Sequence, residues 1–181
     1  MLLDRRKFLT GAGAFGLSLG GTVPTLAQPP NPDYTIKIAP MSVELAPSKV
    51  IQTYGYNGTV PGPVLRLREN RPVSIQIVND TDIDDIIHWH GLFVPPEVDG
   101  AMEERSPMVP AHGGSKLYTF TPKPTGTRWY HSHDVAGKDL KRSMYAGLYG
   151  FLIVEPTNDP GRYDKEKIGR ASCRERVLRL V

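Results

Sequence analysis

Apolar and polar residues alternate along short stretches throughout the middle of the chain. In 64–68 the order is Val, Leu, Arg, Leu, Arg, and in 73–78 one Val and two Ile recur at every second position. Successive side chains of a β-strand point to opposite faces, so this alternation indicates strands with one buried face. The strands predicted in this way cover 34–45, 50–54, 64–68, 73–78, 86–90, 117–120, 127–133 and 148–155.

Turn-forming residues separate these stretches. Asn57-Gly58 and Pro61-Gly62-Pro63 are strong turn signals. The body shows no convincing helical period, although 134–143 has room for one helical turn. Short strands at this spacing predict an all-β fold, an antiparallel sandwich. The turn-rich stretch 91–114 is long for a connection in a small domain, and such loops are often functional.

The first residues have the composition of an export signal. Three basic residues at 5–7 precede a Gly-rich, weakly apolar segment, and Thr-Leu-Ala at 25–27 resembles a cleavage site. The paired arginines followed by Phe-Leu are typical of a twin-arginine signal, which exports folded proteins. We therefore predict that 1–27 is a twin-arginine signal peptide. The twin-arginine export machinery is then a partner, and the protein is periplasmic or extracellular.

The last residues differ in composition from the rest of the chain. Residues 167–181 are rich in arginine and show no strand alternation. The codons to which 168–177 naturally back-translates resemble a common sequencing adapter. We interpret 167–181 as an artefact rather than native sequence, with a genuine basic tail as the alternative. The folded domain is then expected to cover 28–166.

The charge distribution argues against a nucleic-acid surface. The chain has 22 basic and 19 acidic side chains and a net charge of +3, but the basic excess lies in the two terminal stretches. The body is mildly acidic, whereas nucleic-acid binding needs a basic patch. One acidic run precedes the strand at 86–90 and is expected to be a solvated loop: Asp80, Asp82, Asp84 and Asp85. One basic run is expected to face water: Lys138, Lys141 and Arg142.

Four of the five histidines form two pairs, and these pairs carry the candidate chemistry. His88 and His90 flank a tryptophan, and His131 and His133 flank a serine. Residues i and i+2 of a strand share a face, so each pair presents two imidazoles side by side. Imidazole is a good ligand for both copper and zinc. The fifth histidine, His112, sits in a turn and is expected to be a solvated loop residue.

Zinc sites and serine nucleophiles usually carry signatures that are absent from this sequence. It contains no Cys₂His₂ spacing, no His-Glu-x-x-His and no Gly-x-Ser-x-Gly elbow. The only cysteine, Cys173, lies in the arginine-rich terminal stretch, so the body has no disulfide or thiolate site. Ligand type therefore favours copper over zinc. Met102, Met108 and Met144 are scattered and are expected to fill gaps in loops or core rather than to bind Cu(I).

Five motifs in this order resemble the first cupredoxin domain of multicopper oxidases, the family of laccases and bacterial periplasmic cuprous oxidases. They are Asn-Gly-Thr-Val-Pro-Gly-Pro at 57–63, His-Trp-His-Gly-Leu at 88–92, Glu-Val-Asp-Gly at 97–100, Gly-Thr-Arg-Trp-Tyr-His-Ser-His at 126–133 and Gly-Leu-Tyr-Gly-Phe-Leu-Ile-Val-Glu at 147–155. The resemblance covers about 34–166. It implies a Greek-key, cupredoxin-like β-sandwich.

The resemblance also implies a role for each candidate residue. In that family a mononuclear copper takes electrons from the substrate, and a trinuclear copper cluster reduces O₂ to water. By position, His88 would bind the type 2 copper, and His90, His131 and His133 would bind the type 3 pair. Asp99 matches an acidic residue that helps to deliver protons to the reduced oxygen. The alternative for Asp99 is a turn residue that precedes Gly100.

The chain also departs from the family pattern. The other four cluster histidines and the mononuclear, type 1 site belong to a later cupredoxin domain, and no such residues occur here. We therefore expect a truncated N-terminal domain that holds a copper half-site and does not reduce O₂ alone. The alternatives are a stand-alone periplasmic copper carrier and a metal-free structural protein. The reducing substrate (phenol, pigment, Cu(I) or another metal ion) and a two- or three-domain parent are left open.

Overall fold

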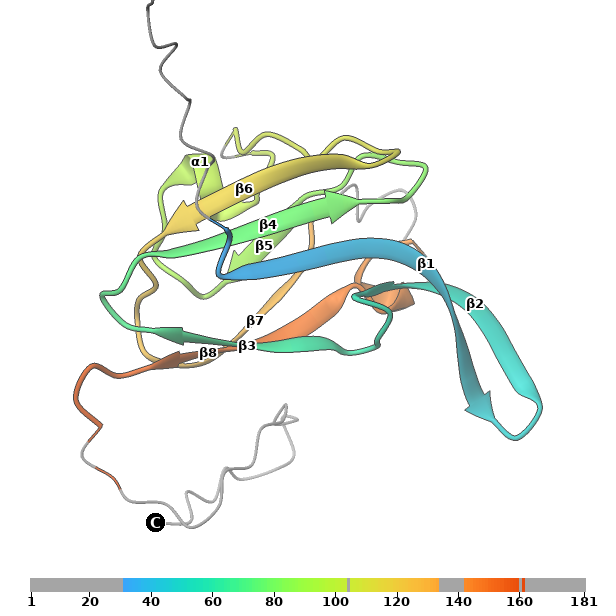
Figure 1. Cartoon of the computed structure of the whole chain (residues 1–181), viewed down its shortest axis with the longest axis horizontal. Coiled ribbons are helices and arrows are strands. Elements are labelled where there is room, and N and C mark those ends of the chain that lie inside the picture. The colour runs from blue at the N-terminus through green and yellow to red at the C-terminus, as the bar shows by residue number, and fades with distance from the viewer. Residues whose placement is uncertain (1–30, 104, 134–141, 160, 162–181) are drawn as a thin grey trace, which may run out of the picture. The chain divides into compact units, whose positions relative to one another are not determined.

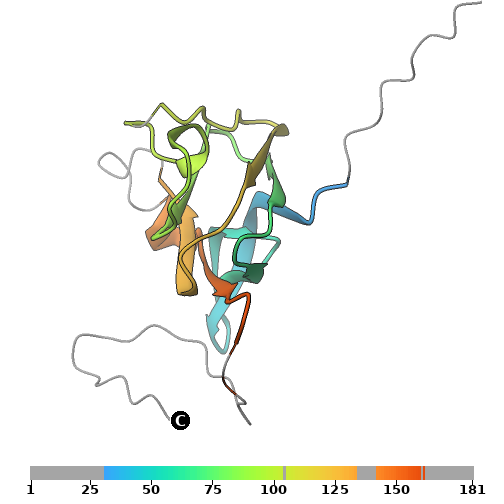
Figure 2. The ribbon, with the colours of Figure 1, turned by 90° about the vertical axis from the view of Figure 1, so that its left-hand side faces the viewer.

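Two four-stranded sheets form the part of the chain that the computed structural model describes, which is residues 31–103, 105–133, 142–159 and 161 (Figure 1 and Figure 2). One sheet has the order β2-β1-β4-β6 and the other the order β3-β8-β7-β5. The strands are β1 (Tyr34–Ala46), β2 (Lys49–Tyr56), β3 (Gly62–Arg68), β4 (Val73–Asn79), β5 (Ile87–His90), β6 (Gly114–Phe120), β7 (Gly126–Ser132) and β8 (Tyr149–Glu155). The predicted all-β sandwich and its eight strands are confirmed.

The prediction of a purely antiparallel sandwich is wrong. β1 runs parallel to β4, and β3 runs parallel to β8, while the other four neighbouring pairs are antiparallel. Alternation along a strand reports which side chains are buried, but it carries no information about the direction of the neighbouring strand. The parallel pairs join strands that are far apart in sequence.

In the described part of the chain, two short helical turns interrupt the strands. One is α1 (Pro96–Asp99), which lies inside the long loop that the sequence marks as a candidate functional segment. It begins after Pro95 and ends at Gly100, whose φ of 82° is left-handed. The other is the 3₁₀ turn η2 (Met144–Ala146). The helical turn expected within 134–143 falls mainly outside the described residues. Among the described residues, no helix is long and apolar enough to cross a membrane.

Large aromatic side chains fill the space between the two sheets. Trp89 is fully buried, and its ring contacts those of Tyr118, Phe120 and Tyr130 at centroid distances of 5.5, 5.2 and 6.2 Å. Trp89 therefore anchors β5 to the core. Its two sequence neighbours, His88 and His90, must then point away from the core, because side chains alternate along a strand.

Three buried tyrosines predict the response of the fold to alkaline pH. Burial raises the pKa of Tyr56, Tyr118 and Tyr130 above the usual value of 10. Above pH 10 the unfolded chain releases protons that the folded chain retains, so the free energy of unfolding falls as pH rises. Each tyrosine contributes up to about 1.4 kcal/mol per pH unit. Denaturant unfolding between pH 8 and 11.5 measures this slope.

The control variants separate buried from exposed tyrosines. Tyr118→Phe is expected to reduce the slope of the free energy of unfolding against pH by the contribution of about one proton. Tyr145→Phe, at a residue that is 86% exposed, should leave this slope unchanged. A free energy of unfolding that stays constant from pH 9 to 11.5 would contradict the prediction.

Candidate metal centre

The pairing of β5 with β7 brings the two histidine pairs together. The strands are antiparallel, and His88 lies directly opposite His131. Residues opposite one another on neighbouring strands share a face of the sheet, so His90 joins the same face. His133 follows the last residue of β7, and its N–H donates to the carbonyl of Ile86 at 2.9 Å.

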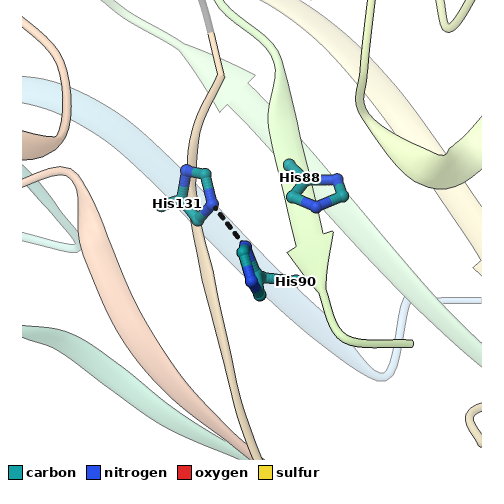
Figure 3. Close-up of side chains that lie close together, drawn as sticks. All are labelled: His88, His90 and His131. Atoms are coloured by element: carbon teal, nitrogen blue, oxygen red, sulfur yellow. Dashed lines mark hydrogen bonds between the residues drawn. The ribbon is translucent and has the colours of Figure 1, made fainter. Parts of the chain in front are cut away.

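The four imidazoles surround one small space. The ring centroid of His88 lies 5.4 Å from that of His90, 5.4 Å from that of His131 and 5.2 Å from that of His133. One ring nitrogen each from His88, His90 and His131 lies within 4.8 Å of the others. Figure 3 shows these three rings converging, with His90 Nδ1 3.3 Å from His131 Nε2. The structure therefore gathers all four histidines that the sequence singles out.

The environment of His90 and His131 favours the neutral imidazole, the form that a metal ligand must take. Burial lowers the pKa of His131 to about 4, and the neighbouring imidazoles of His88, His90 and His133 act in the same direction. Burial also lowers the pKa of His90, again with help from His88 and His133. A neutral imidazole offers one nitrogen lone pair to a metal ion.

Asp99 lies beside His88. Nδ1 of His88 lies 2.8 Å from the backbone carbonyl oxygen of Asp99 and 3.3 Å from its carboxylate Oδ2. A proton on Nδ1 donated to that carbonyl leaves Nε2 as the ligand atom, which is the usual outer-shell arrangement of metal-binding histidines. Asp99 is also the last residue of α1 before Gly100. Asp99 therefore both ends a helical turn and contacts His88 of the candidate metal centre.

Trp129 packs against two of the imidazoles. Its ring stacks on His131 at a centroid distance of 4.1 Å and an interplanar angle of 28°, and it lies 4.8 Å from the ring of His90. Trp129 and Tyr130 face opposite sides of the strand, because side chains alternate, and Tyr130 is in the core. The sequence analysis does not predict the stacking of Trp129 on His131, although their i and i+2 spacing is the signal that could have done so.

Arg128 fastens the strands at the outer end of the site. Its Nε donates to the carbonyl of Gly91 at 3.1 Å, and its two terminal nitrogens donate to the carbonyls of Thr127 and Thr125 at 2.9 and 3.0 Å. Gly91 directly follows His90. The bond therefore ties the end of β5 to the start of β7, and nothing in the local sequence pattern predicts it.

The acidic run before β5 divides into exposed and buried members. Asp80, Asp82 and Asp84 are exposed, as the sequence predicts, but Asp85 is only 4% exposed. The prediction that Asp85 is solvated is therefore wrong. The physical reason is a backbone bridge. Asp85 and Val109 exchange both N–H···O bonds, at 3.1 and 2.7 Å, so the loop segment that contains Val109 packs against Asp85.

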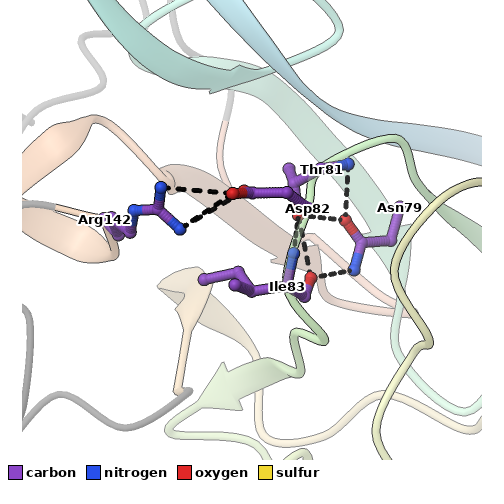
Figure 4. A network of polar contacts seen from close by, with 5 residues as sticks. All are labelled: Asn79, Thr81, Asp82, Ile83 and Arg142. Atoms are coloured by element: carbon purple, nitrogen blue, oxygen red, sulfur yellow. Dashed lines mark hydrogen bonds and ion pairs between the residues drawn. The ribbon is translucent and has the colours of Figure 1, made fainter.

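A polar network holds the rest of this run (Figure 4). The side-chain amide of Asn79 donates to the carbonyl of Ile83 at 2.8 Å, and the hydroxyl of Thr81 donates to Asn79 Oδ1 at 2.7 Å. Both terminal nitrogens of Arg142 reach the carboxylate of Asp82 at 3.2 Å. Arg142 is therefore ion-paired rather than simply facing water, and Lys138 and Lys141 lie outside the described residues.

The remaining sequence candidates lie outside the cluster. His112 is exposed in a turn with φ of 56°, which confirms the expectation of a loop histidine. Met102 is exposed, whereas Met108 and Met144 are half-buried. The described residues contain one group of histidine, cysteine or carboxylate side chains with metal-binding spacing, and that group is the imidazole cluster.

Known proteins resemble this chain in sequence. The family model described as Multicopper oxidase matches residues 37–159. Copper resistance protein A of Pseudomonas syringae pv. tomato is 30% identical over 178 residues, which is 91% of this chain and 28% of that protein. The multicopper oxidase mco of Staphylococcus aureus is 33% identical over 139 residues, which is 75% of this chain and 30% of that protein.

Solved structures lead to the same conclusion. Lac15 from a marine microbial metagenome superimposes with a TM-score of 0.61 at 34% identity, over 70% of this chain and 33% of that chain. A multicopper oxidase from Pseudomonas thermotolerans gives a TM-score of 0.61 at 32% identity, over 70% of this chain and 30% of that chain. The chain spans about three tenths of the length of these curated relatives. Its fold is cupredoxin-like, and the chain belongs to the multicopper oxidase family.

Proposed function

We propose that this chain carries the copper-binding N-terminal domain of a multicopper oxidase, with half of a trinuclear copper cluster. In this proposal His88 binds the type 2 copper, and His90, His131 and His133 bind the type 3 pair. The observation that carries it is the face shared by β5 and β7, on which three imidazoles offer ligand nitrogens within 4.8 Å of one another. The family membership supports copper as the metal.

The donor set fits copper. The cluster is built from imidazoles and contains no thiolate, and among divalent first-row metals copper binds such nitrogen donors most strongly. Two of the rings have one nitrogen engaged by a backbone carbonyl: His88 Nδ1 at 2.8 Å from Asp99 and His131 Nδ1 at 2.9 Å from Ser132. These contacts fix ring orientation and leave Nε2 as the ligand atom, as in other metal-binding histidines.

Bound copper would supply the one-electron steps that couple substrate oxidation to the four-electron reduction of O₂ to water. The residues of this chain hold and orient it. Trp129 stacks on His131 and shields one side of the imidazoles from water. In this proposal Asp99 passes protons from solvent towards the site, which its partial exposure of about a fifth and the distance of 3.3 Å from its carboxylate to His88 Nδ1 support.

The intact oxidase would need a further cupredoxin domain for its remaining cluster ligands and for its mononuclear copper. In this proposal the folded domain covers 28–166, 1–27 directs twin-arginine export to the periplasm or beyond, and 167–181 is not native. The chain by itself then has no electron entry site. A laccase-like activity on a reducing substrate belongs to the whole protein.

Copper titration of the full chain tests the proposal. We expect Cu(II) to bind at pH 7 through the imidazoles and to be removed by dialysis against a chelator, because half of the ligand set is missing. Oxygen uptake with a phenol or with Cu(I) should stay at the uncatalysed rate. Turnover by the chain alone would overturn the proposed inactivity, and an absence of copper binding would overturn the proposed site.

The same titration separates the half-site from a copper carrier. The cluster of three close imidazoles is the observation that favours a carrier, because it is sufficient to hold one ion. A carrier should retain one copper per chain through the dialysis, whereas a half-site should not.

A further inference from the structure

One buried carboxylate lies behind the imidazole cluster. Asp85 is 4% exposed and stands three residues before His88, and it is the buried acidic side chain among the described residues. Placing a carboxylate in an apolar interior is unfavourable unless hydrogen bonds compensate for the lost water. Its position therefore depends on the specific partners that hold it.

The partners of Asp85 come from three separate segments. Its Oδ1 accepts a hydrogen bond from the hydroxyl of Ser132 at 2.7 Å and one from the N–H of Ile86 at 2.7 Å. Its backbone is bridged to Val109 in both directions. Val109 is itself held by the side-chain amide of Asn79, which donates to its carbonyl at 3.0 Å. The position of the Asp85 carboxylate is therefore also set by contacts other than its hydrogen bond to Ser132.

Ser132 is the link between this carboxylate and the metal centre. It is 2% exposed and lies between His131 and His133 in sequence. Strand alternation turns its hydroxyl away from the face on which the imidazole of His131 lies. It is also the last residue of β7, where it pairs with Ile87 of β5. Beyond Ser132 regular strand pairing ends, and His133 is tied to this edge by one backbone bond to Ile86.

We infer that Asp85 and Ser132 form a positioning pair for the metal centre. Their side-chain hydrogen bond joins the segment that enters β5 to the end of β7, and so sets the spacing between the histidines of the two strands. Neither residue is one of the proposed copper ligands. The inference rests on the proposed copper site, since it assigns the pair a purpose in holding those ligands.

The experiment measures Cu(II) binding by the full chain at pH 7 in competition with a chelator. Ser132→Ala, which removes one oxygen and is expected to fold, should raise the Kd for Cu(II) about 10-fold or more, as loss of outer-shell partners does. Asp85→Ala should give a similar change. The Kd of the double variant should not exceed the higher of the two single-variant Kd values, because both substitutions break the same hydrogen bond.

Two further readouts separate positioning from general stability. The electron paramagnetic resonance spectrum of bound Cu(II) should change in Ser132→Ala, because the ligand geometry changes. Asp85→Asn keeps an acceptor oxygen for Ser132 and should restore most of the binding that Asp85→Ala loses. Asp84→Asn is the matched control: this neighbouring acid is exposed, and its carboxylate accepts a hydrogen bond from the N–H of Ala111, so the Kd of this variant should equal that of the original chain.

The outcomes are distinguishable. An unchanged Kd and an unchanged spectrum in Ser132→Ala, even with a lower unfolding temperature, would overturn the positioning role and leave the copper site intact. Additive losses in the double variant would also overturn it. If the original chain binds no Cu(II), the proposed function fails, and the inference falls with it. Should Asp85→Ala not fold, Ser132→Ala and Asp85→Asn decide the question.

Discussion

Replacing His131 by alanine is expected to lower the affinity for Cu(II) at least about 100-fold, the upper end of the loss caused by removing an outer-shell partner. The effect should be large, since the ring of His131 lies within 6 Å of the rings of His88, His90 and His133. The imidazole of His131 is also neutral well below pH 7, because burial lowers its pKa to about 4. Competition with a chelator at pH 7 measures the change.

His112 supplies the control. It is exposed and has a left-handed backbone with φ of 56°, so His112→Asn is the suitable substitution because asparagine tolerates that conformation. Its Cu(II) affinity should equal that of the original chain. An equal loss of affinity in both variants would show that copper binds imidazoles non-specifically, which would contradict the proposed site.

Replacing Gly100 by alanine is expected to destabilise the fold by about 4 kcal/mol or more, in the range reserved for severe backbone conflicts. A Cβ at this position would lie 1.8 Å from the carbonyl oxygen of Ile87 and 2.7 Å from the Cα of His88. Both are backbone atoms of β5 and cannot turn aside. The residue is also left-handed, with φ of 82°. Denaturant unfolding of the copper-free chain measures the loss.

The same substitution reaches the metal centre. Gly100 follows Asp99, whose carbonyl meets His88 Nδ1, so relief of the clash must shift either α1 or β5. The fraction of Gly100→Ala that folds should therefore bind Cu(II) more weakly.

Gly58→Ala is the matched control for backbone strain alone. Gly58 has φ of 71°, and nothing lies within 4 Å of a Cβ built there. Only the left-handed penalty of about 1–2 kcal/mol is expected, with no change in Cu(II) affinity. Equal destabilisation of the two variants would refute the role assigned to close packing at Gly100.

Much of the fold could be predicted because strand signals are local. Alternation in 64–68 and 73–78 and the turn residues at 57–63 are present in the sequence itself, and the corresponding strands form. The parallel pairing of β1 with β4 could not be predicted in this way. It depends on which strands become neighbours within a sheet, and residues 34–38 pair with residues 75–79 far along the chain.

Some features of the candidate site could also be predicted from the sequence, and others only from the structure. The i and i+2 spacing within each histidine pair predicts two imidazoles on one face, and the family resemblance names both pairs and Asp99. That these residues bind copper and deliver protons stays a prediction. The structure alone shows that His88 lies opposite His131 and that Trp129 stacks on the cluster.

The sequence by itself determined the strand positions, the outward-facing histidine pairs and the membership of the multicopper oxidase family, because each of these is written in short contiguous patterns. Only the tertiary structure decided the strand directions, the burial of Asp85 and its bond to Ser132. An acidic residue in a polar run predicts a solvated loop. Its burial arises from a backbone bridge to Val109, 24 positions later, and no local pattern encodes a contact made over such a separation.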